Sequence, residues 1–373
     1  MNGFLNNVKI IDASRVFAGP FTTMILSDLG AEVIKIENPE GGDETRYYQP
    51  LINKMSSYFV SINRNKSSIC LNLKKEEDKK KLFELLKDAE VFIHNFKNST
   101  INSLGIGFDK LKEINNKIIY VTISTYGDNT SRFEEPGYDI VMQGETGLLS
   151  VTGTSKDEFC RVGNSTVDVY TGYMAAIMIA SALFKKSIDP TFNGVHINVP
   201  LFNTGIYSMT YLFGYYTALG KDPQPSGVTH PGIVPYQKFD TEDEPIIIAI
   251  ANENLWNNFC RAIQRKDLLT NMKFKDNEQR VKNRNILIPI LQDILIKKRS
   301  SEWLKILKEN GIPASKINKI SDIVHSDFVN SFGGLFEKEI DGKKFYFPVF
   351  PATVNKEYLN FYRKDPPILC AKK

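Results

Sequence analysis

The feature that most constrains the fold of this chain is a regular alternation of short apolar segments with helix-length segments between Val8 and Ser124. The segments Val8–Asp12 (VKIID) and Glu32–Glu37 (EVIKIE) are typical of buried strands, and the helix expected between them, from about Pro20 to Leu29, ends at a glycine. Further strands are expected at Ser68–Leu73, Val91–Asn95 and Ile118–Ser124. Because strands connected through helices run parallel, the sequence predicts an α/β fold with a parallel sheet covered by helices.

The rest of the chain predicts a second, smaller domain. A Pro/Gly-rich stretch, Lys221–Tyr236, precedes a region with one expected strand and several amphipathic helices, which is typical of an α+β domain. We therefore expect a large domain at residues 1–220 and a smaller α+β domain at 221–329. Aromatic segments flank a hairpin signal, Asp341-Gly342, and we expect residues 330–373 to return to the large domain.

The charge balance argues against nucleic acid as a partner. The chain has 47 Lys and Arg against 43 Asp and Glu, a net charge of +4, without long single-sign blocks. The start of the chain lacks the charged head and long apolar core of a signal peptide, and the longest apolar run, Met174–Phe184, is too short to span a bilayer. We expect a cytoplasmic protein with no membrane partner.

The cysteines and histidines indicate neither a disulfide framework nor a metal site. The cysteines are far apart and form no CxxC pair, so we expect reduced thiols at Cys70, Cys160, Cys260 and Cys370. The four histidines show no ligand spacing, so no metal is expected. The common motifs for dinucleotides, nucleoside triphosphates, zinc hydrolysis and serine hydrolysis are absent, which leaves chemistry based on a carboxylate.

The strongest candidate for such chemistry is Asp168, at the start of a long helix expected to run to about Lys186. This helix is apolar nearly all round and rich in Gly and Ala, so we expect it to be buried. A carboxylate at its start can accept hydrogen bonds from free N–H groups as an N-cap, or stay ionised there and attack an electrophile. Position alone leaves both roles open, and capping is the commoner one.

Loops at the predicted strand ends mix basic, amide and apolar side chains, which suits an adenine nucleotide: Ser14–Pro20, Asn63–Lys74 and His94–Ser99. Together with later segments, they resemble the class III coenzyme A transferase family (CaiB/BaiF type), which contains formyl-CoA:oxalate and carnitine CoA-transferases. The motifs that carry this resemblance occur in the family's order. They are AGPFTTMILSDLGAEVIKIENPEGGD (Ala18–Asp43), NRNKSS, the Asn95-Phe96 pair, PGYD (Pro136–Asp139), VGNSTVD ending at Asp168, PYQKF (Pro235–Phe239), the Asn252–Trp256 helix start and GIPASKI (Gly311–Ile317).

The resemblance implies that Asp168 is the nucleophile of a CoA-transferase, which moves CoA from an acyl-CoA to a carboxylic acid through aspartyl anhydride and aspartyl-CoA thioester intermediates. CoA is then a substrate rather than a bound cofactor, and a small carboxylic acid and a second copy of the chain are the other partners. The implied fold is a Rossmann-like large domain with a smaller α+β domain, in an interlocked homodimer. The implied CoA contacts are Val16, Phe17, Ala18, Leu71, Lys74, Asn95, Phe96, Lys97, Leu104 and Tyr138, and the implied substrate contacts are Phe17, Tyr138 and Asp139.

Some positions depart from the family pattern. Asn38 and Ser103 stand where basic residues are common, so another residue must hold the 3′-phosphate of CoA, with Arg46, Arg64 and Lys97 as candidates. Phe17 replaces a Gln of the formyl-CoA:oxalate enzymes, which favours a different acid.

Two other functions stay open. α-Methylacyl-CoA racemases, of the same superfamily, place a His and the equivalent Asp on the α-carbon, but the His position is Tyr138 here. A tyrosine, with an ordinary pKa of about 10, is a poor match for that acid/base role. The third alternative is a catalytically silent CoA-binding protein in which Asp168 only caps its helix.

Overall fold

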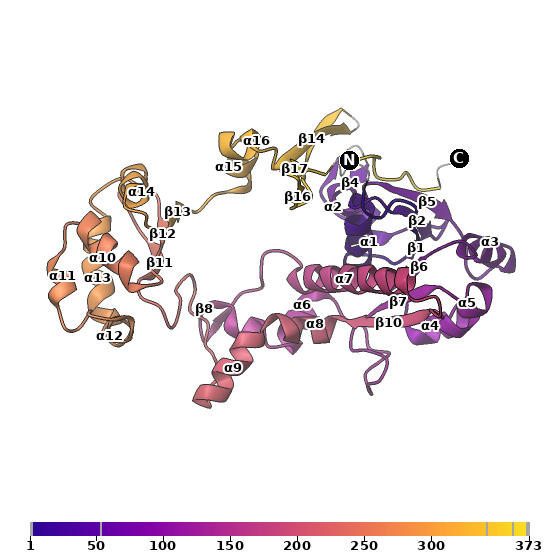
Figure 1. The fold of residues 1–373 in the computed structure, drawn as a ribbon, viewed down its shortest axis with the longest axis horizontal. Helices are drawn as coiled ribbons and strands as arrows, with labels where there is room; N and C mark the ends of the chain where they lie inside the picture. The colour runs from indigo at the N-terminus through magenta and orange to yellow at the C-terminus, as the bar shows by residue number, and fades with distance from the viewer. Residues whose placement is uncertain (1–2, 53, 341, 360–361, 371–373) are drawn as a thin grey trace. The chain divides into compact units, whose positions relative to one another are not determined.

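A six-stranded parallel sheet forms the centre of the larger of two units in the computed structural model, which describes residues 3–52, 54–340, 342–359 and 362–370 (Figure 1). The strand order is β10-β7-β6-β1-β2-β5, and every neighbouring pair is parallel. All five strands predicted before residue 125 are present, whereas the edge strand β10 is an addition to the prediction. The bounds are β1 (Lys9–Ala13), β2 (Glu32–Glu37), β5 (Lys66–Cys70), β6 (Val91–His94), β7 (Ile119–Ser124) and β10 (Val195–Pro200).

Helices cover both faces of this sheet. Ile10 of β1 belongs to the apolar cluster beneath α1 and α7, whereas its neighbour Ile11 belongs to the cluster beneath α3, α4 and α5. Side chains alternate along a strand, so consecutive apolar residues need a core on each face. The helices of this unit are α1 (Ala18–Asp28), α2 (Ser57–Ile62), α3 (Glu76–Leu86), α4 (Asn98–Leu104), α5 (Phe108–Ile114), α6 (Asp139–Glu145), α7 (Thr166–Ile188), α8 (Leu201–Ser208) and α9 (Thr210–Leu219), with the short turn η1 (Glu44–Tyr47).

Helix α7 is longer and less buried than predicted. Gly172 allows it to approach α1 closely, because a Cβ there would lie 2.7 Å from the Phe21 ring and 3.2 Å from the Ala18 carbonyl. Only this side is buried, and Tyr173, Ile177 and Phe184 on the other side are exposed. With 23 residues, α7 is the one helix among the described residues that is long and apolar enough to cross a membrane, although it packs against α1, α8 and β7. The expectation that no apolar segment reaches that length is therefore wrong.

The contacts between residues divide the chain into two units that differ from the predicted domains mainly at one segment, Ser150–Cys160. The larger unit comprises Met1–Leu149, Arg161–Asp222 and Asn330–Lys373, and the smaller unit comprises Ser150–Cys160 and Pro223–Val329. The short hairpin of β8 (Gly153–Ser155) and β9 (Glu158–Phe159), preceded by η2 (Leu149–Val151), thus belongs with the smaller unit. A backbone hydrogen bond from Gly227 to Gly153, at 2.8 Å, ties the hairpin to it, and such a distant contact leaves no local signal in the sequence.

The smaller unit has its own core around an antiparallel sheet, β11 (Tyr236–Phe239), β12 (Ile246–Ala249) and β13 (Ala314–Lys316). Trp256 and Phe259 from α10 pack there with Leu291 from α13. Its helices are α10 (Glu253–Ala262), α11 (Asp267–Thr270), α12 (Asn277–Lys282), α13 (Arg284–Leu295), α14 (Ser300–Glu309) and α15 (Ile320–Val324), and α16 (Asp327–Ser331) crosses its boundary.

The C-terminal segment belongs to the larger unit. Strands flank the predicted turn as β14 (Leu335–Ile340) and β15 (Lys343–Pro348), while Asp341 itself lies outside the described residues. Phe345 and Phe347 of this hairpin pack against Val60 of α2. Four further short strands form two pairs, β3 (Leu51–Ile52) with β4 (Met55–Ser56), and β16 (Thr353–Val354) with β17 (Glu357–Tyr358).

A disulfide joins Cys70, at the end of β5, to Cys370 in this C-terminal segment. The prediction of reduced thiols is therefore wrong for this pair, whereas Cys160 and Cys260 are free. The two bonded cysteines are 300 positions apart, and only the return of the chain to the sheet brings them together. Spacing along the sequence could not reveal that contact.

Candidate active site

A cavity of about 330 Å³ opens at the carboxyl ends of β1, β6 and β7, within the larger unit. The loops that follow these strands meet there because the carboxyl ends of parallel strands share one edge of the sheet. The residues just before α6 and the first turn of α7 complete the cavity. Of the residues predicted to form the site, those that line the cavity are Val16, Phe17, Ala18, Asn95, Phe96, Lys97, Tyr138 and Asp168.

Four predicted residues lie elsewhere. Leu71 and Leu104 pack in the core on one face of the sheet, where they are 3% and 9% exposed, and Lys74 is exposed beyond the end of β5. Their CoA contacts stay predictions. Asp139 is buried and accepts hydrogen bonds from backbone N–H groups of α7, so its placement does not favour the predicted substrate contact.

Two of the three candidates for the 3′-phosphate are already engaged. Arg46 pairs with Glu37 at 2.7 Å and donates to the Pro367 carbonyl, and Arg64 pairs with the carboxylate of Asp28. Lys97 is exposed and lines the cavity. Of the three, Lys97 is therefore placed best for an anionic group.

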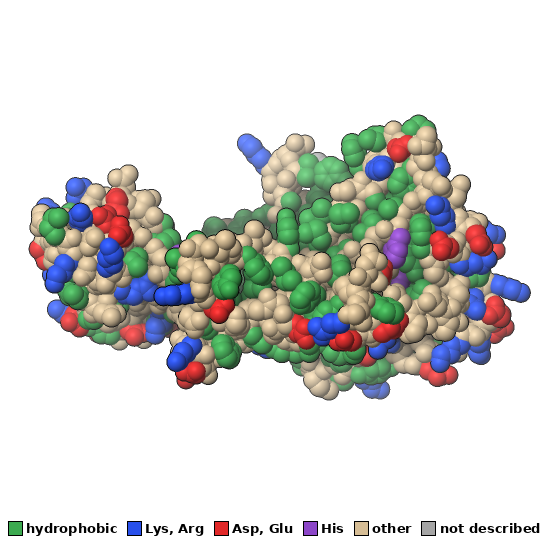
Figure 2. Space-filling view, turned by 90° about the horizontal axis from the view of Figure 1, so that it is seen from below, with side chains coloured by type: hydrophobic (Ala, Val, Ile, Leu, Met, Phe, Trp, Pro, Cys, Tyr) green, Lys and Arg blue, Asp and Glu red, His purple; other side chains and the backbone are tan. Residues whose placement is uncertain are grey.

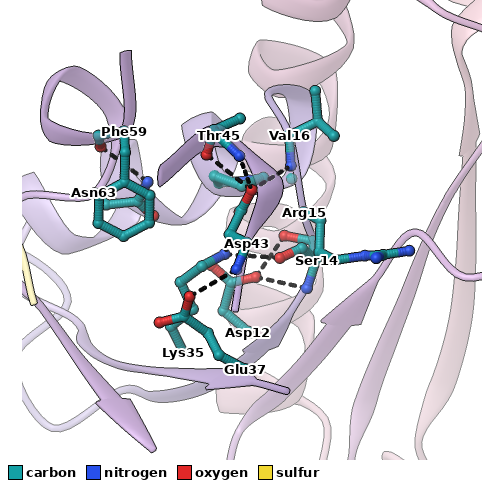
Figure 3. A network of polar contacts seen from close by, with 12 residues as sticks. Asp12, Ser14, Arg15, Val16, Lys35, Glu37, Asp43, Thr45, Phe59 and Asn63 are labelled. Atoms are coloured by element: carbon teal, nitrogen blue, oxygen red, sulfur yellow. Dashed lines mark hydrogen bonds and ion pairs between the residues drawn. The ribbon is translucent and has the colours of Figure 1, made fainter. Parts of the chain in front are cut away.

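Side chains from neighbouring elements hold the loop after β1 by its backbone (Figure 3). Asp12 accepts a hydrogen bond from the Ser14 N–H at 2.9 Å, and Lys35 donates to the Ser14 carbonyl at 2.8 Å. Asp43 accepts the N–H of Val16 at 3.4 Å. The course of this loop is thus fixed by groups outside it.

Asn95, in the loop after β6, also holds the backbone of the loop after β1. Its side-chain oxygen accepts the Arg15 N–H at 3.0 Å, and its Nδ2 donates to the Arg15 carbonyl at 2.8 Å. Val16 has φ of 70°, a left-handed conformation that is costly for a β-branched side chain and needs support from its surroundings. Asn95, which was predicted to contact CoA, thus uses both its side-chain oxygen and its Nδ2 to hold the neighbouring loop.

Asp12 and Asp43, which hold the loop after β1, belong to two fully buried ion pairs. Lys35 lies 3.0 Å from Asp43, and Lys66 lies 3.1 Å from Asp12. Burial opposes the charge of Asp12, but the two lysines, together with hydrogen bonds from Ser14 and Thr23, outweigh it and hold the pKa of Asp12 at about 2. These residues were not predicted from the sequence, although charged side chains inside apolar strands such as EVIKIE are a signal that could have found them.

Asp168 faces the cavity from the first turn of α7 without capping that helix. The cap comes from Asp139 of α6, whose Oδ1 accepts the N–H of Val167 at 2.8 Å. Burial, and secondly the charge of Asp139, raise the pKa of Asp168 to about 7. Asp139 therefore fills the capping role, while the Asp168 carboxyl faces the cavity.

A row of aromatic rings stands beside Asp168. The ring centroids of Phe17 and Tyr58 are 5.7 Å apart, and those of Tyr58 and Tyr48 are 5.6 Å apart. Burial, with a further contribution from Asp168, raises the pKa of Tyr58 to about 12, so its hydroxyl stays protonated and able to donate a hydrogen bond. Tyr48 and Tyr58 were not among the predicted site residues, because no local pattern links α2 to α7.

This chain is similar to known proteins over most of its length. The sequence profile of CoA-transferase family III matches residues 5–371. A human succinyl-CoA:glutarate CoA-transferase is 34% identical over 336 residues, which cover 90% of this chain and 76% of the relative. An acetyl-CoA:oxalate CoA-transferase of Acetobacter aceti is 33% identical over 321 residues, covering 86% and 82%.

A solved structure shares the fold over almost the whole chain. It is a CaiB/BaiF family protein from Brucella suis, 30% identical, with a TM-score of 0.87 and coverage of 99% of this chain and 97% of that one. The chain therefore belongs to CoA-transferase family III and is an enzyme of the CoA-transferase class.

Proposed function

We propose that this enzyme moves CoA from an acyl-CoA to a small carboxylic acid with Asp168 as the nucleophile. The observation that carries the proposal is that the Asp168 carboxyl faces the cavity while Asp139 caps the helix behind it. Two of the three loops that resemble the family's CoA contacts, Ser14–Pro20 and His94–Ser99, contribute residues to the lining of the same cavity. A carboxylate suits this reaction because each exchange replaces one acyl bond with another of similar energy.

In the first half of the proposed reaction, a carboxylate oxygen of Asp168 attacks the thioester carbon of the donor. The C–S bond breaks, CoA leaves as the thiolate, and a mixed anhydride remains on Asp168. The thiolate then attacks the aspartyl carbonyl carbon. The donor acid leaves as a carboxylate, and an aspartyl-CoA thioester remains.

In the second half, the acceptor carboxylate attacks the aspartyl thioester and again expels the CoA thiolate. The thiolate attacks the acyl carbon of the acceptor in the new anhydride, which forms the product thioester and regenerates the Asp168 carboxylate. No proton is gained or lost overall. Water has to be excluded from the two anhydrides and the thioester, and the apolar side chains of Phe17, Phe133 and Leu201 in the cavity wall favour this.

A racemase is a weaker alternative. It needs a second acid/base group opposite Asp168, and the matching position holds Tyr138, which is 58% exposed at the start of α6. The related proteins described above are named as CoA-transferases. A silent CoA-binding protein is disfavoured in turn because Asp168 has no capping role.

Mass spectrometry of the protein after incubation with single acyl-CoAs tests the proposal. We expect an acyl or CoA adduct on Asp168, and no adduct and no CoA exchange in Asp168→Ala. With a 2-methylacyl-CoA in deuterated water, we expect no deuterium at the α-carbon. Full exchange by the Ala variant, or rapid α-deuteration without an acceptor, would overturn the assignment.

The partners follow from the same proposal. Phe17 in the cavity favours an acid other than oxalate. A homodimer, interlocked as the family resemblance implies, would cover aromatic side chains of α9, which has no buried residue and exposes 74% of Tyr211. Basic and acidic side chains are mixed over the face shown in Figure 2, which favours small-molecule partners over nucleic acid.

A further inference from the structure

Helix α6 holds the segment that carries the nucleophile through two side chains one turn apart. Asp139 Oδ1 accepts the N–H of Val167 at 2.8 Å and that of Asp168 at 3.4 Å. Its other oxygen, Oδ2, accepts Nε2 of Gln143 at 2.6 Å. Gln143 Oε1 in turn accepts the N–H of Val162 at 3.0 Å.

This network is shielded from solvent. Asp139 is 6% exposed and Gln143 is fully buried. The N-cap residue of α7, Ser165, makes no side-chain cap of its own. Free N–H groups at a helix start attract a nearby carboxylate, and Asp168 is the acidic residue in the first turn of α7, so without Asp139 it is available to cap its own helix.

The network has two consequences for Asp168. Since Asp139 satisfies the helix, the Asp168 carboxyl does not have to turn back onto its own backbone and can face the cavity. A negative charge beside a second carboxylate also makes the second one more basic, and a more basic carboxylate is a stronger nucleophile.

We propose that Asp139 is a positioning residue for the transferase reaction, which keeps the Asp168 carboxyl uncapped and makes it more nucleophilic through its charge. This inference rests on the proposed function of Asp168. It replaces the substrate contact expected of Asp139 from the family resemblance.

Other charged or titratable groups also face Asp168. Tyr58 from α2 is coupled to it, and its hydroxyl stays protonated because of burial and this coupling. Those that line the same cavity are Arg15, Glu44, Lys97, Asp128, Glu135 and Tyr138. Asp139 is the one charge that contributes, after burial, to the raised pKa of Asp168, so its removal is the informative change.

The variant Asp139→Asn removes the charge and keeps the cap, because its amide oxygen can still accept the two N–H groups, while Gln143 has to turn its amide so that Oε1 meets the new Nδ2 donor. We expect the acid limb of kcat/KM for CoA transfer to move to lower pH by about one unit, with an unchanged KM for acyl-CoA. Asp139→Ala loses the cap as well, and we expect a lower kcat than in Asp139→Asn. An acid limb that stays in place in Asp139→Asn would overturn the inference, even if the Ala variant does not fold.

A matched control is Asp243→Asn. Asp243 caps the start of another helix, α14, by accepting the Ser300 N–H at 2.7 Å. This variant must leave the pH profile of kcat/KM unchanged. An equal shift of the acid limb in Asp243→Asn would mean that the loss of any negative charge moves the profile.

A second measurement needs no activity. The difference in unfolding free energy between wild type and Asp168→Asn is followed against pH and reports the pKa of Asp168. The same difference, measured between Asp139→Asn and the double variant Asp139→Asn/Asp168→Asn, must report a lower pKa. If the wild type transfers no CoA at any pH, the proposed function fails, while this titration still decides the role of Asp139. Equal titrations in both backgrounds would overturn it.

Discussion

Lys35 and Asp43 form an ion pair of 3.0 Å in which both side chains are completely buried, and together they hold the backbone of the loop at Ser14 and Val16. Removing one partner of such a pair leaves an uncompensated charge in the protein interior. We expect Lys35→Met to lower the free energy of unfolding by about 3–5 kcal/mol, measured by urea denaturation. As a control, Lys9→Met removes a lysine that pairs with the exposed Asp88, and should cost about 1 kcal/mol or less. Equal losses in the two variants would contradict a special role for the buried pair.

The strained conformation of Val16 predicts a rescue. Asn95→Ala removes both hydrogen bonds to the Arg15 backbone, and we expect CoA affinity to fall roughly tenfold, since each bond contributes about 0.5–1.5 kcal/mol. Glycine adopts positive φ without strain, so Val16→Gly in the Asn95→Ala background should restore part of the affinity. Calorimetry on the four proteins of this cycle measures the coupling. Additive effects would mean that Asn95 acts on CoA directly.

The raised pKa of Asp168 predicts that the wild type loses stability as the pH rises. The carboxyl ionises near 3.8 in the unfolded chain and near 7 in the folded one, because of burial and Asp139. Between these values the folded state binds a proton that the unfolded state lacks, so stability decreases as pH rises.

Asp168→Asn cannot ionise and avoids this loss. The gain in unfolding free energy of Asp168→Asn over wild type should be absent below about pH 4, grow up to about pH 7 and then stay constant. Thermal unfolding of both proteins across this range provides the measurement. A difference of the same size at every pH would show that Asp168 does not titrate there.

Affinities for CoA and for 3′-dephospho-CoA distinguish the candidate phosphate contacts. Lys97 lines the cavity, whereas Lys74 is exposed beyond β5. We expect Lys97→Ala to weaken the binding of CoA by about 1.5–3 kcal/mol, the value of a charged hydrogen bond. The binding of dephospho-CoA should stay almost unchanged. If Lys74→Ala shows that pattern instead, the 3′-phosphate lies at the end of β5.

The local patterns of the chain predicted much of the larger unit. The strand Glu32–Glu37 was predicted with its observed bounds, because its apolar residues and the preceding Gly30 mark both ends. The loops at the strand ends and Asp168 were found in the same way. These features depend on residues close together in the sequence, or on motifs that the family keeps in order.

Features that join distant segments could not be predicted. The cap from Asp139 to α7 and the proximity of Tyr58 to Asp168 arise only when α2, α6 and α7 pack together. Leu71 shows a different case, since the resemblance marks it as a CoA contact and the structure places its side chain in the core. A motif identifies a position but does not show whether its side chain or its backbone is what the site uses.

The Cys70–Cys370 bond also has a topological consequence. It closes the chain between these residues into a covalent ring that contains the whole smaller unit. If two copies interlock as proposed, closing both rings makes the dimer a catenane, in which two loops stay linked after every noncovalent contact is lost. Oxidised protein, denatured in detergent without reductant, should then migrate as a dimer even when the exposed Cys160 is replaced by alanine. Cys70→Ser or added reductant should release single chains, and a single-chain band from the unreduced protein would show that the rings are not threaded.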